Sequence, residues 1–180
     1  MNLHTLHTLH DWDAATCTRF NLVNHHRFPS AIFAAVSRLG DGWFWYALLV
    51  SMPLVWGLTG LFQAALMAVS GLACTFTYRW IKGRTRRPRP SEVYQHLRVT
   101  VAPLDRFSFP SGHTLHAVAF TCMAGWWHPA LLWVLAPFTV LVALSRLVLG
   151  LHYPSDVLVG AMIGAGLAGA ALALGSICGL

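Results

Sequence analysis

Three short stretches of this sequence combine basic, nucleophilic and acidic side chains. Ser145–Asp156 carries an arginine, a histidine and an aspartate, Lys82–Pro90 is dense in basic residues, and Phe109–His113 ends in a serine, a glycine and a histidine. Each stretch lies at the end of a strongly apolar run. Ionisable groups at the edge of a membrane segment are costly to keep, so their collection there indicates a site rather than packing.

The composition indicates an integral membrane protein of one domain. Of its 180 residues, 56% are hydrophobic and only 10% are charged, which is rare in a soluble chain. The net charge of +6 comes from basic residues beside apolar segments, so an anionic lipid is favoured over nucleic acid as the partner. The four cysteines stand singly and show neither a disulfide framework nor metal-ligand spacing.

Residues 1–42 are the least membrane-like part and are predicted to form an N-terminal interfacial segment. Histidines and leucines recur every third residue over 3–10, which favours an amphipathic start, with a metal-binding tract as the alternative. Residues 11–24 and 29–39 are predicted to be short helices that lie along the bilayer surface. No basic region followed by an apolar core opens the chain, so a cleavable signal peptide is not expected.

Residues 43–180 are predicted to form the membrane-embedded domain, an all-α bundle of about five transmembrane helices. The expected spans cover residues 43–58, 61–80, 111–127, 130–149 and 157–177. In the last span, Gly160 and Gly164 form a GxxxG pattern, which permits close helix contact and predicts a place in the bundle centre.

The order of the spans brings the three chemical stretches to one side of the membrane. The second span ends at Lys82, the third begins near His113, the fourth ends near Arg146 and the fifth begins after His152. Side chains about 70 residues apart can therefore share one pocket. The connection over 83–110 is long for a loop without structure, and loops of that length are usually functional.

The spacing within the three stretches resembles the signature of the type 2 phosphatidic acid phosphatase and vanadium haloperoxidase superfamily. The resemblance covers about residues 43–177 and rests on three motifs: Lys82, six residues and Arg89-Pro90; Pro110-Ser111-Gly112-His113; and Ser145-Arg146, five residues, His152, three residues and Asp156. In size and number of spans, the chain is also similar to small bacterial undecaprenyl pyrophosphate phosphatases.

The residues of the motifs suit the hydrolysis of a phosphate ester. Lys82, Arg89 and Arg146 supply three positive charges for the phosphate oxygens, and the two guanidinium groups offer forked donors. Ser111 and the backbone amide of Gly112 add donors at a helix start, where the dipole favours an anion. This chemistry needs no metal and no cofactor.

The roles of the two histidines are implied by the resemblance, since spacing alone does not tell which one attacks. His152 would be the nucleophile that forms a phosphohistidine, and Asp156, four residues on, would fix its tautomer. His113 would be the general acid and then the base that activates water. Other basic residues are predicted either to hold headgroups or simply to mark the interface: Arg84, Arg86, Arg87, Arg98 and Arg106.

The resemblance therefore implies a multi-pass cell membrane enzyme that hydrolyses a lipid phosphate, most specifically undecaprenyl pyrophosphate, with no obligatory protein partner. The alternatives are a phosphatidate or phosphatidylglycerophosphate phosphatase, a vanadate-dependent oxidant enzyme, and a non-enzymatic scaffold or transporter. The side of the membrane stays open. All twelve Lys and Arg residues fall on or near the motif face, which favours the cytoplasm, whereas the undecaprenyl reaction is expected on the outer face.

Overall fold

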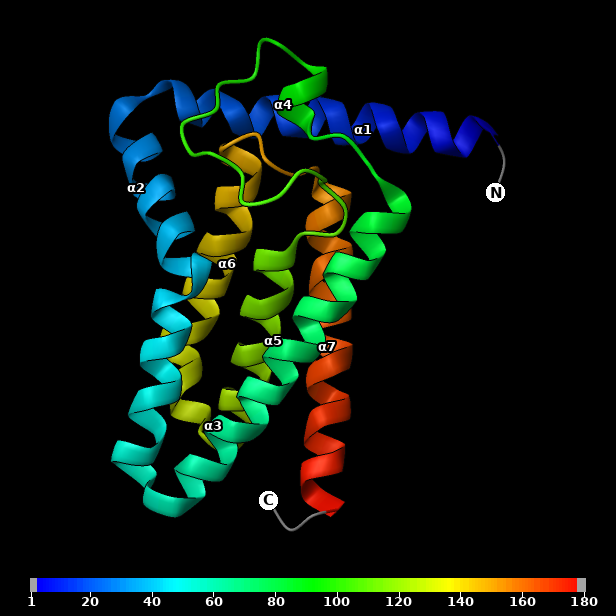
Figure 1. Cartoon of the computed structure of the whole chain (residues 1–180). Coiled ribbons are helices and arrows are strands. Elements are labelled where there is room, and N and C mark those ends of the chain that lie inside the picture. Colours follow the sequence, from blue (N-terminus) through cyan, green and yellow to red (C-terminus); the bar gives the residue numbers. More distant parts are fainter. Residues whose placement is uncertain (1–2, 178–180) are drawn as a thin grey trace.

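The computed structural model describes residues 3–177, which form helices and loops without a strand. Most of the chain builds a bundle of long helices, and α1 lies across one end of it (Figure 1). In chain order the elements are α1 (Leu3–Asn21), η1 (Leu22–His25), α2 (Arg27–Arg38), η2 (Leu39–Trp43), α3 (Phe44–Thr85), α4 (Pro90–Val93), α5 (Gly112–Trp127), η3 (Pro129–Leu131), α6 (Leu132–Val148) and α7 (Pro154–Ile177). The predicted all-α membrane bundle is confirmed.

The longest helix, α3, is two helices joined by a sharp reversal. Gly57 has φ 58° and ψ −136°, a conformation that residues with a Cβ rarely adopt. The chain turns back there, so α3 forms an antiparallel pair of arms whose turn lies at the end of the bundle away from α1 (Figure 1). Three stretches are long and apolar enough to cross a membrane, and they cover Arg27–Val93, Pro129–Val148 and Pro154–Ile177.

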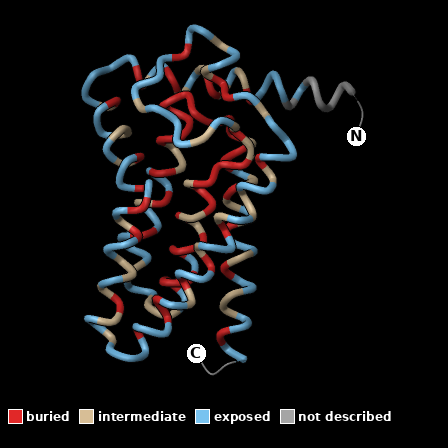
Figure 2. The backbone as a smooth tube through the Cα atoms, in the orientation of Figure 1, coloured by how far each residue is buried: buried red, intermediate tan, exposed pale blue. Residues whose placement is uncertain are grey.

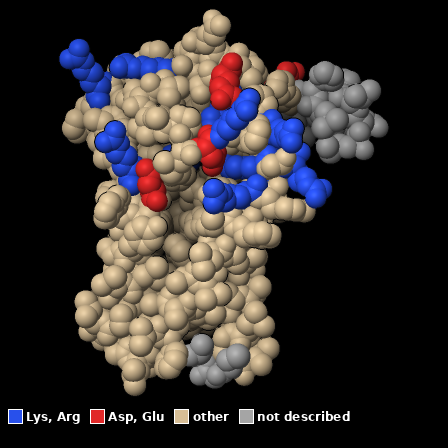
Figure 3. Space-filling view, in the orientation of Figure 1, with Lys and Arg blue, Asp and Glu red and all other residues tan. Residues whose placement is uncertain are grey.

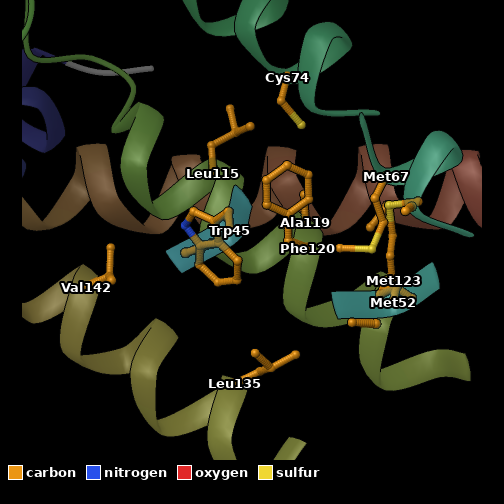
Figure 4. Packing of buried hydrophobic residues seen from close by; sticks show 14 residues of the cluster. Trp45, Met52, Met67, Cys74, Leu115, Ala119, Phe120, Met123, Leu135 and Val142 are labelled. Atoms are coloured by element: carbon orange, nitrogen blue, oxygen red, sulfur yellow. The ribbon is translucent and has the colours of Figure 1, made fainter. Parts of the chain in front are cut away.

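Helix α5 forms the centre of the bundle. Its 16 residues extend about 24 Å, less than the roughly 30 Å of a hydrocarbon core. Its side chains are nevertheless buried by protein, because Leu115 and Phe120 pack with Trp45 and Met67 of α3 and Val142 of α6 (Figure 4). Exposed residues lie mainly on the outward surfaces of the surrounding helices (Figure 2).

Glycines of α7 allow α5 to approach its backbone closely. A Cβ at Gly160 would lie 2.6 Å from the carbonyl oxygen of Ser111, and one at Gly164 would lie 2.3 Å from that of Leu115. Both distances are far inside van der Waals contact, so neither position has room for a side chain. The close helix contact predicted from the GxxxG pattern is confirmed, and it fixes the start of α5 against α7. The predicted place of this last span in the bundle centre is wrong, because α5 lies there and Leu158 and Met162 of α7 are exposed.

The two N-terminal helices lie in different directions. α1 crosses the end of the bundle, whereas α2 runs along the bundle axis beside α6 and continues through η2 into α3 (Figure 1). The sequence predicted that α2 would lie along the bilayer surface. Its small polar residues Ser30 and Ser37 are buried, while Phe28 is 77% exposed and Ile32 44% exposed. Phe28 and Ile32 therefore point outward, as apolar side chains do in a helix surrounded by lipid, whereas Val36 packs against the core of the bundle.

The connection from α3 to α5 is folded against the N-terminal helices. Asn21 donates from Nδ2 to the carbonyl oxygens of Arg98 at 2.9 Å and Val148 at 2.8 Å, and it accepts the N–H of Arg98 at 2.8 Å. The Asn24 side chain also donates to the Arg98 carbonyl at 2.5 Å. Buried asparagines thus hold the connection over one end of the bundle.

Candidate active site

The eight predicted site residues lie at the charged end of the bundle. On the face shown in Figure 3, the Lys, Arg, Asp and Glu side chains gather at this end and are absent from the rest of the described surface. The residues come from five places: the end of α3, the start of α4, the start of α5, the last turn of α6, and the segment from the α6–α7 connection into the first turn of α7. Their numbers are Lys82, Arg89, Ser111, Gly112, His113, Arg146, His152 and Asp156.

Lys82 and Arg89 share one carboxylate. Lys82 Nζ lies 2.7 and 2.9 Å from the two carboxylate oxygens of Asp105, and Arg89 Nη2 lies 2.7 Å from Oδ1. Both basic side chains are buried, at 6% and 2% exposed, while the Asp105 side chain is 37% exposed. Burial tends to raise the pKa of Asp105, but the hydrogen bond and charge of Lys82 outweigh it and lower the pKa below its usual value. Asp105 was not predicted from the sequence.

His152 is buried between a cation and a carboxylate. Its Nε2 lies 3.4 Å from Nη1 of Arg89, and its Nδ1 lies 3.6 Å from Oδ2 of Asp156. Burial lowers the pKa of His152 well below its usual value, and the positive charges of Arg146, Arg89 and Lys82 lower it further. The imidazole is therefore neutral at neutral pH, and Nε2 is the ring nitrogen that faces the cations.

Asp156 is held by more donors than the sequence predicted. Its Oδ2 accepts the backbone N–H of Tyr153 at 2.9 Å, and its Oδ1 accepts Nη1 of Arg87 at 2.7 Å. The other end of the same guanidinium donates to Asp13 of α1 at 2.7 Å, and Asp13 also accepts the N–H of Ser155 at 3.0 Å. Arg87, predicted to contact headgroups or mark the interface, is turned inward and links α1 to the carboxylate beside His152.

Arg146 is buried with few partners. Its residue is 2% exposed, its Nη1 donates to the hydroxyl of Ser37 on α2, and its Nε has no hydrogen-bond partner. Within the part of the chain that the structure describes, no carboxylate lies within ion-pair distance of it. A buried guanidinium in this state is electrostatically unsatisfied.

The start of α5 presents Ser111, Gly112 and His113. The Ser111 hydroxyl lies 3.0 Å from that of Thr114, and its N–H donates to the carbonyl oxygen of Asp156 at 3.0 Å. These contacts join the starts of α5 and α7. Nε2 of His113 is hydrogen-bonded to the carboxylate of Asp41 in η2, a partner that the sequence did not predict.

A cavity of about 490 Å³ extends from the charged end into the apolar part of the bundle. It lies between the two arms of α3 and against α5, and its apolar lining includes Trp45, Leu49, Leu72 and Phe120. At its polar end the cavity is lined by Asp41, Asp105 and His113. The apolar part of this lining suits an apolar chain, while Lys82, Arg89, Arg146 and His152 are not among the residues that line the cavity.

The described residues contain no group of three or more His, Cys, Asp or Glu side chains that could hold a metal ion. The cations of the site are instead the three basic side chains themselves. Their arrangement can bind an anion with several oxygens and place it beside the Nε2 of His152.

A helical membrane bundle with a buried histidine, its carboxylate and three cations at one end defines a class of membrane proteins built to bind an anion. Residues 59–176 match the family model of the PAP2 superfamily, and the chain belongs to this superfamily. The resemblance of its three motifs to this family is thereby confirmed.

Parts of the chain are similar to bacterial phosphatases that act on polyprenyl lipids by name. The chain is 45% identical over 84 residues to a decaprenylphosphoryl-5-phosphoribose phosphatase of Mycolicibacterium smegmatis, covering 44% of this chain and 42% of the relative. It is 34% identical over 118 residues to a candidate undecaprenyl-diphosphatase of Escherichia coli K12, YbjG, covering 61% of this chain and 56% of the relative. The chain thus matches about half the length of these relatives.

The fold matches that of a solved membrane protein over nearly its whole length. The crystal structure of a transmembrane PAP2-type phosphatidylglycerolphosphate phosphatase from Bacillus subtilis superposes with a TM-score of 0.78. The match covers 94% of this chain and 87% of that chain at 22% sequence identity. The two proteins therefore share a fold. The substrate in the name of the Bacillus subtilis protein is that protein's own.

Proposed function

We propose that this protein is an integral membrane lipid phosphatase that transfers a phosphoryl group from a lipid to His152 and then to water. The observation that carries the proposal is the placement of His152, whose Nε2 faces Arg89 while its Nδ1 faces Asp156. A neutral imidazole held between a cation cluster and a carboxylate is arranged to attack an anionic phosphorus centre.

In the first step, Nε2 of His152 forms a bond to phosphorus and the bond from phosphorus to the leaving oxygen breaks. The leaving oxygen keeps the electron pair and takes a proton from His113, while Asp156 stabilises the imidazolium form of His152. In the second step, a water oxygen attacks phosphorus, His113 takes the water proton, and the N–P bond breaks. Lys82, Arg89 and Arg146 neutralise the equatorial oxygens in both steps.

A polyprenyl phosphate or pyrophosphate is the substrate class that we propose, with undecaprenyl pyrophosphate as the leading member. The two relatives described above are named for polyprenyl substrates, and the apolar part of the cavity suits a lipid chain. Phosphatidate and phosphatidylglycerophosphate are the alternatives, because the cations recognise the phosphate that all these lipids share.

Phosphate release by the purified protein in detergent tests the activity. The panel comprises undecaprenyl pyrophosphate, decaprenylphosphoryl-5-phosphoribose, phosphatidate and phosphatidylglycerophosphate. We expect turnover of at least one of them, and the His152→Ala variant should lose it entirely because no nucleophile remains. Near-normal release by a folded His152→Ala protein would refute the nucleophile. No release by the wild type from any lipid would favour a scaffold or transporter.

Metal independence is a second part of the proposal. Since the phosphate charge is neutralised by three basic side chains, activity should survive EDTA and be blocked by vanadate, which mimics trigonal-bipyramidal phosphorus. Complete loss on chelation that one divalent ion restores would instead assign the histidines to a metal.

We further propose a multi-pass protein of the cell membrane, whose sidedness separates the substrate alternatives. The C-terminus lies at the end of the bundle away from the site (Figure 1), so a C-terminal reporter fusion locates the opposite face. A cytoplasmic C-terminus supports an outward site and the undecaprenyl reaction. A C-terminus outside favours a cytoplasmic reaction of the phosphatidylglycerophosphate type, which Arg19 and Arg27 near the site end would also favour.

A further inference from the structure

His113 has a carboxylate partner that lies outside the three motifs. Asp41, 72 residues earlier in the chain, belongs to η2 between α2 and α3, and its Oδ1 is hydrogen-bonded to Nε2 of His113. The His113 side chain is 12% exposed and the Asp41 side chain 27% exposed, so the pair is partly shielded from water. Both residues line the polar end of the cavity.

The backbone around Asp41 is built to present this side chain. η2 contains a kink between α2 and α3, because the backbone of Gly42 is not helical. Gly42 has φ 144°, which is accessible to glycine. A Cβ at Gly40 would lie 3.1 Å from Cγ2 of Val142, so the turn is pressed against α6. These contacts fix Asp41 opposite the start of α5.

The hydrogen bond determines which nitrogen of His113 faces the substrate. Because Asp41 occupies Nε2, the nitrogen left for the leaving oxygen is Nδ1, and no described residue is hydrogen-bonded to it. The positive charge of Arg146 on α6 opposes a proton on His113, whereas the charge of Asp41 favours it. A proton on His113 adds positive charge beside Arg146, and Asp41 supplies the opposite charge.

We propose that Asp41 is the positioning residue of the general acid. Its carboxylate accepts the Nε2–H of His113, directs Nδ1 toward the leaving oxygen and stabilises the imidazolium before proton transfer. Nδ1 gives its proton to the leaving oxygen as the P–O bond breaks, and its free electron pair then accepts a proton from the attacking water. This inference rests on the proposed phosphatase function and adds a residue that its motifs do not contain.

The test uses two leaving groups with the Asp41→Asn variant of the full chain. Dioctanoyl phosphatidate releases an alkyl alcohol that needs a proton, whereas an octyl-substituted nitrophenyl phosphate releases an anion that does not. We expect kcat/KM for the alkyl ester to fall about 10- to 100-fold and that for the aryl ester to fall less than about threefold. Equal losses on both esters, or no loss on either, would overturn the proposal.

A double variant tests with the alkyl ester alone whether Asp41 acts through His113. In a His113→Asn background, Asp41→Asn should cause little further loss, because its effect acts through the histidine. A further loss as large as in the wild-type background would assign Asp41 to folding instead. Asp11→Asn, on the exposed side of α1, is the matched control. If the wild type hydrolyses no lipid phosphate at all, the proposed function fails rather than this inference.

Discussion

The cation cluster of Lys82, Arg89 and Arg146 has two parts that differ in their ionic partners. Lys82 and Arg89 share the single negative charge of Asp105, whose Oδ1 lies 2.7 Å from each of them. Arg146 is equally buried but has only the Ser37 hydroxyl as a side-chain partner among the described residues. The comparison indicates that an arriving phosphate gains its largest new interaction at Arg146, whereas it must replace Asp105 to reach the other two cations.

The largest effect that follows is expected from Arg146→Met. The variant should lose about 100- to 1,000-fold in kcat/KM, because one charge-assisted donor to the transition state is gone. Its melting temperature without ligand should equal or exceed that of the wild type, since an unpaired buried charge is replaced by an apolar side chain of similar length. Phosphate release and thermal unfolding in the same detergent measure both quantities.

The matched control is Arg98→Met, which removes the same charge from an exposed side chain of the α4–α5 connection. It should leave kcat/KM within about twofold, as surface substitutions usually do. An Arg146→Met protein that keeps more than a tenth of wild-type activity would remove the distinction between the two parts of the cluster.

A smaller effect is expected from Asp105→Asn, which should strengthen anion binding rather than weaken it. Without the competing carboxylate, vanadate should inhibit about tenfold more strongly, in line with roughly 1.5 kcal/mol for a hydrogen bond to a charged group. The midpoint of vanadate inhibition of phosphate release measures this, with Asp11→Asn as the control for loss of one negative charge. Weaker inhibition would mean that Asp105 assists anion binding rather than competing with it.

The smallest expected effect concerns the protonation of His152, which lies beside both parts of the cluster. Burial and the charges of Arg146, Arg89 and Lys82 lower its pKa, so the neutral ring persists below the usual imidazole value of about 6.5. The ring nitrogen-15 signals assigned with a His152→Asn variant should keep their neutral positions at pH 5.5. An imidazolium signal from His152 already at pH 6.5 would contradict the electrostatic account of the site.

The motif residues of the site could be predicted because span order alone brings them together. Once the apolar runs are counted, Lys82, Arg146 and His152 fall on one side of the membrane whatever the details of packing. Asp105 and Asp41 could not be found this way, because their partners depend on the path of a long connection and on the kink between α2 and α3. The available signal for Asp41 was an acidic residue between two glycines at the edge of an apolar run.

The direction of α2 shows why amphipathic patterns have a limit in membrane proteins. An apolar side containing Phe33 and Val36 is typical of a helix at the bilayer surface, and equally of one packed along a bundle. The structure packs Val36 against the core and also buries Ser30 and Ser37, which provides the Ser37 hydroxyl for Arg146. The sequence gives no period that distinguishes a lipid-facing apolar side from an interfacial one.

The cavity between the arms of α3 has a rim of exposed side chains, with Tyr46 63% and Leu72 72% exposed. A lipid that enters across this rim arrives by lateral diffusion in two dimensions. The quantity that saturates the enzyme is then the mole fraction of substrate in the bilayer, not its molar concentration in the assay. Adding inert lipid at constant total substrate lowers the mole fraction of substrate in the bilayer and slows turnover. The composition of the host bilayer therefore becomes a kinetic variable.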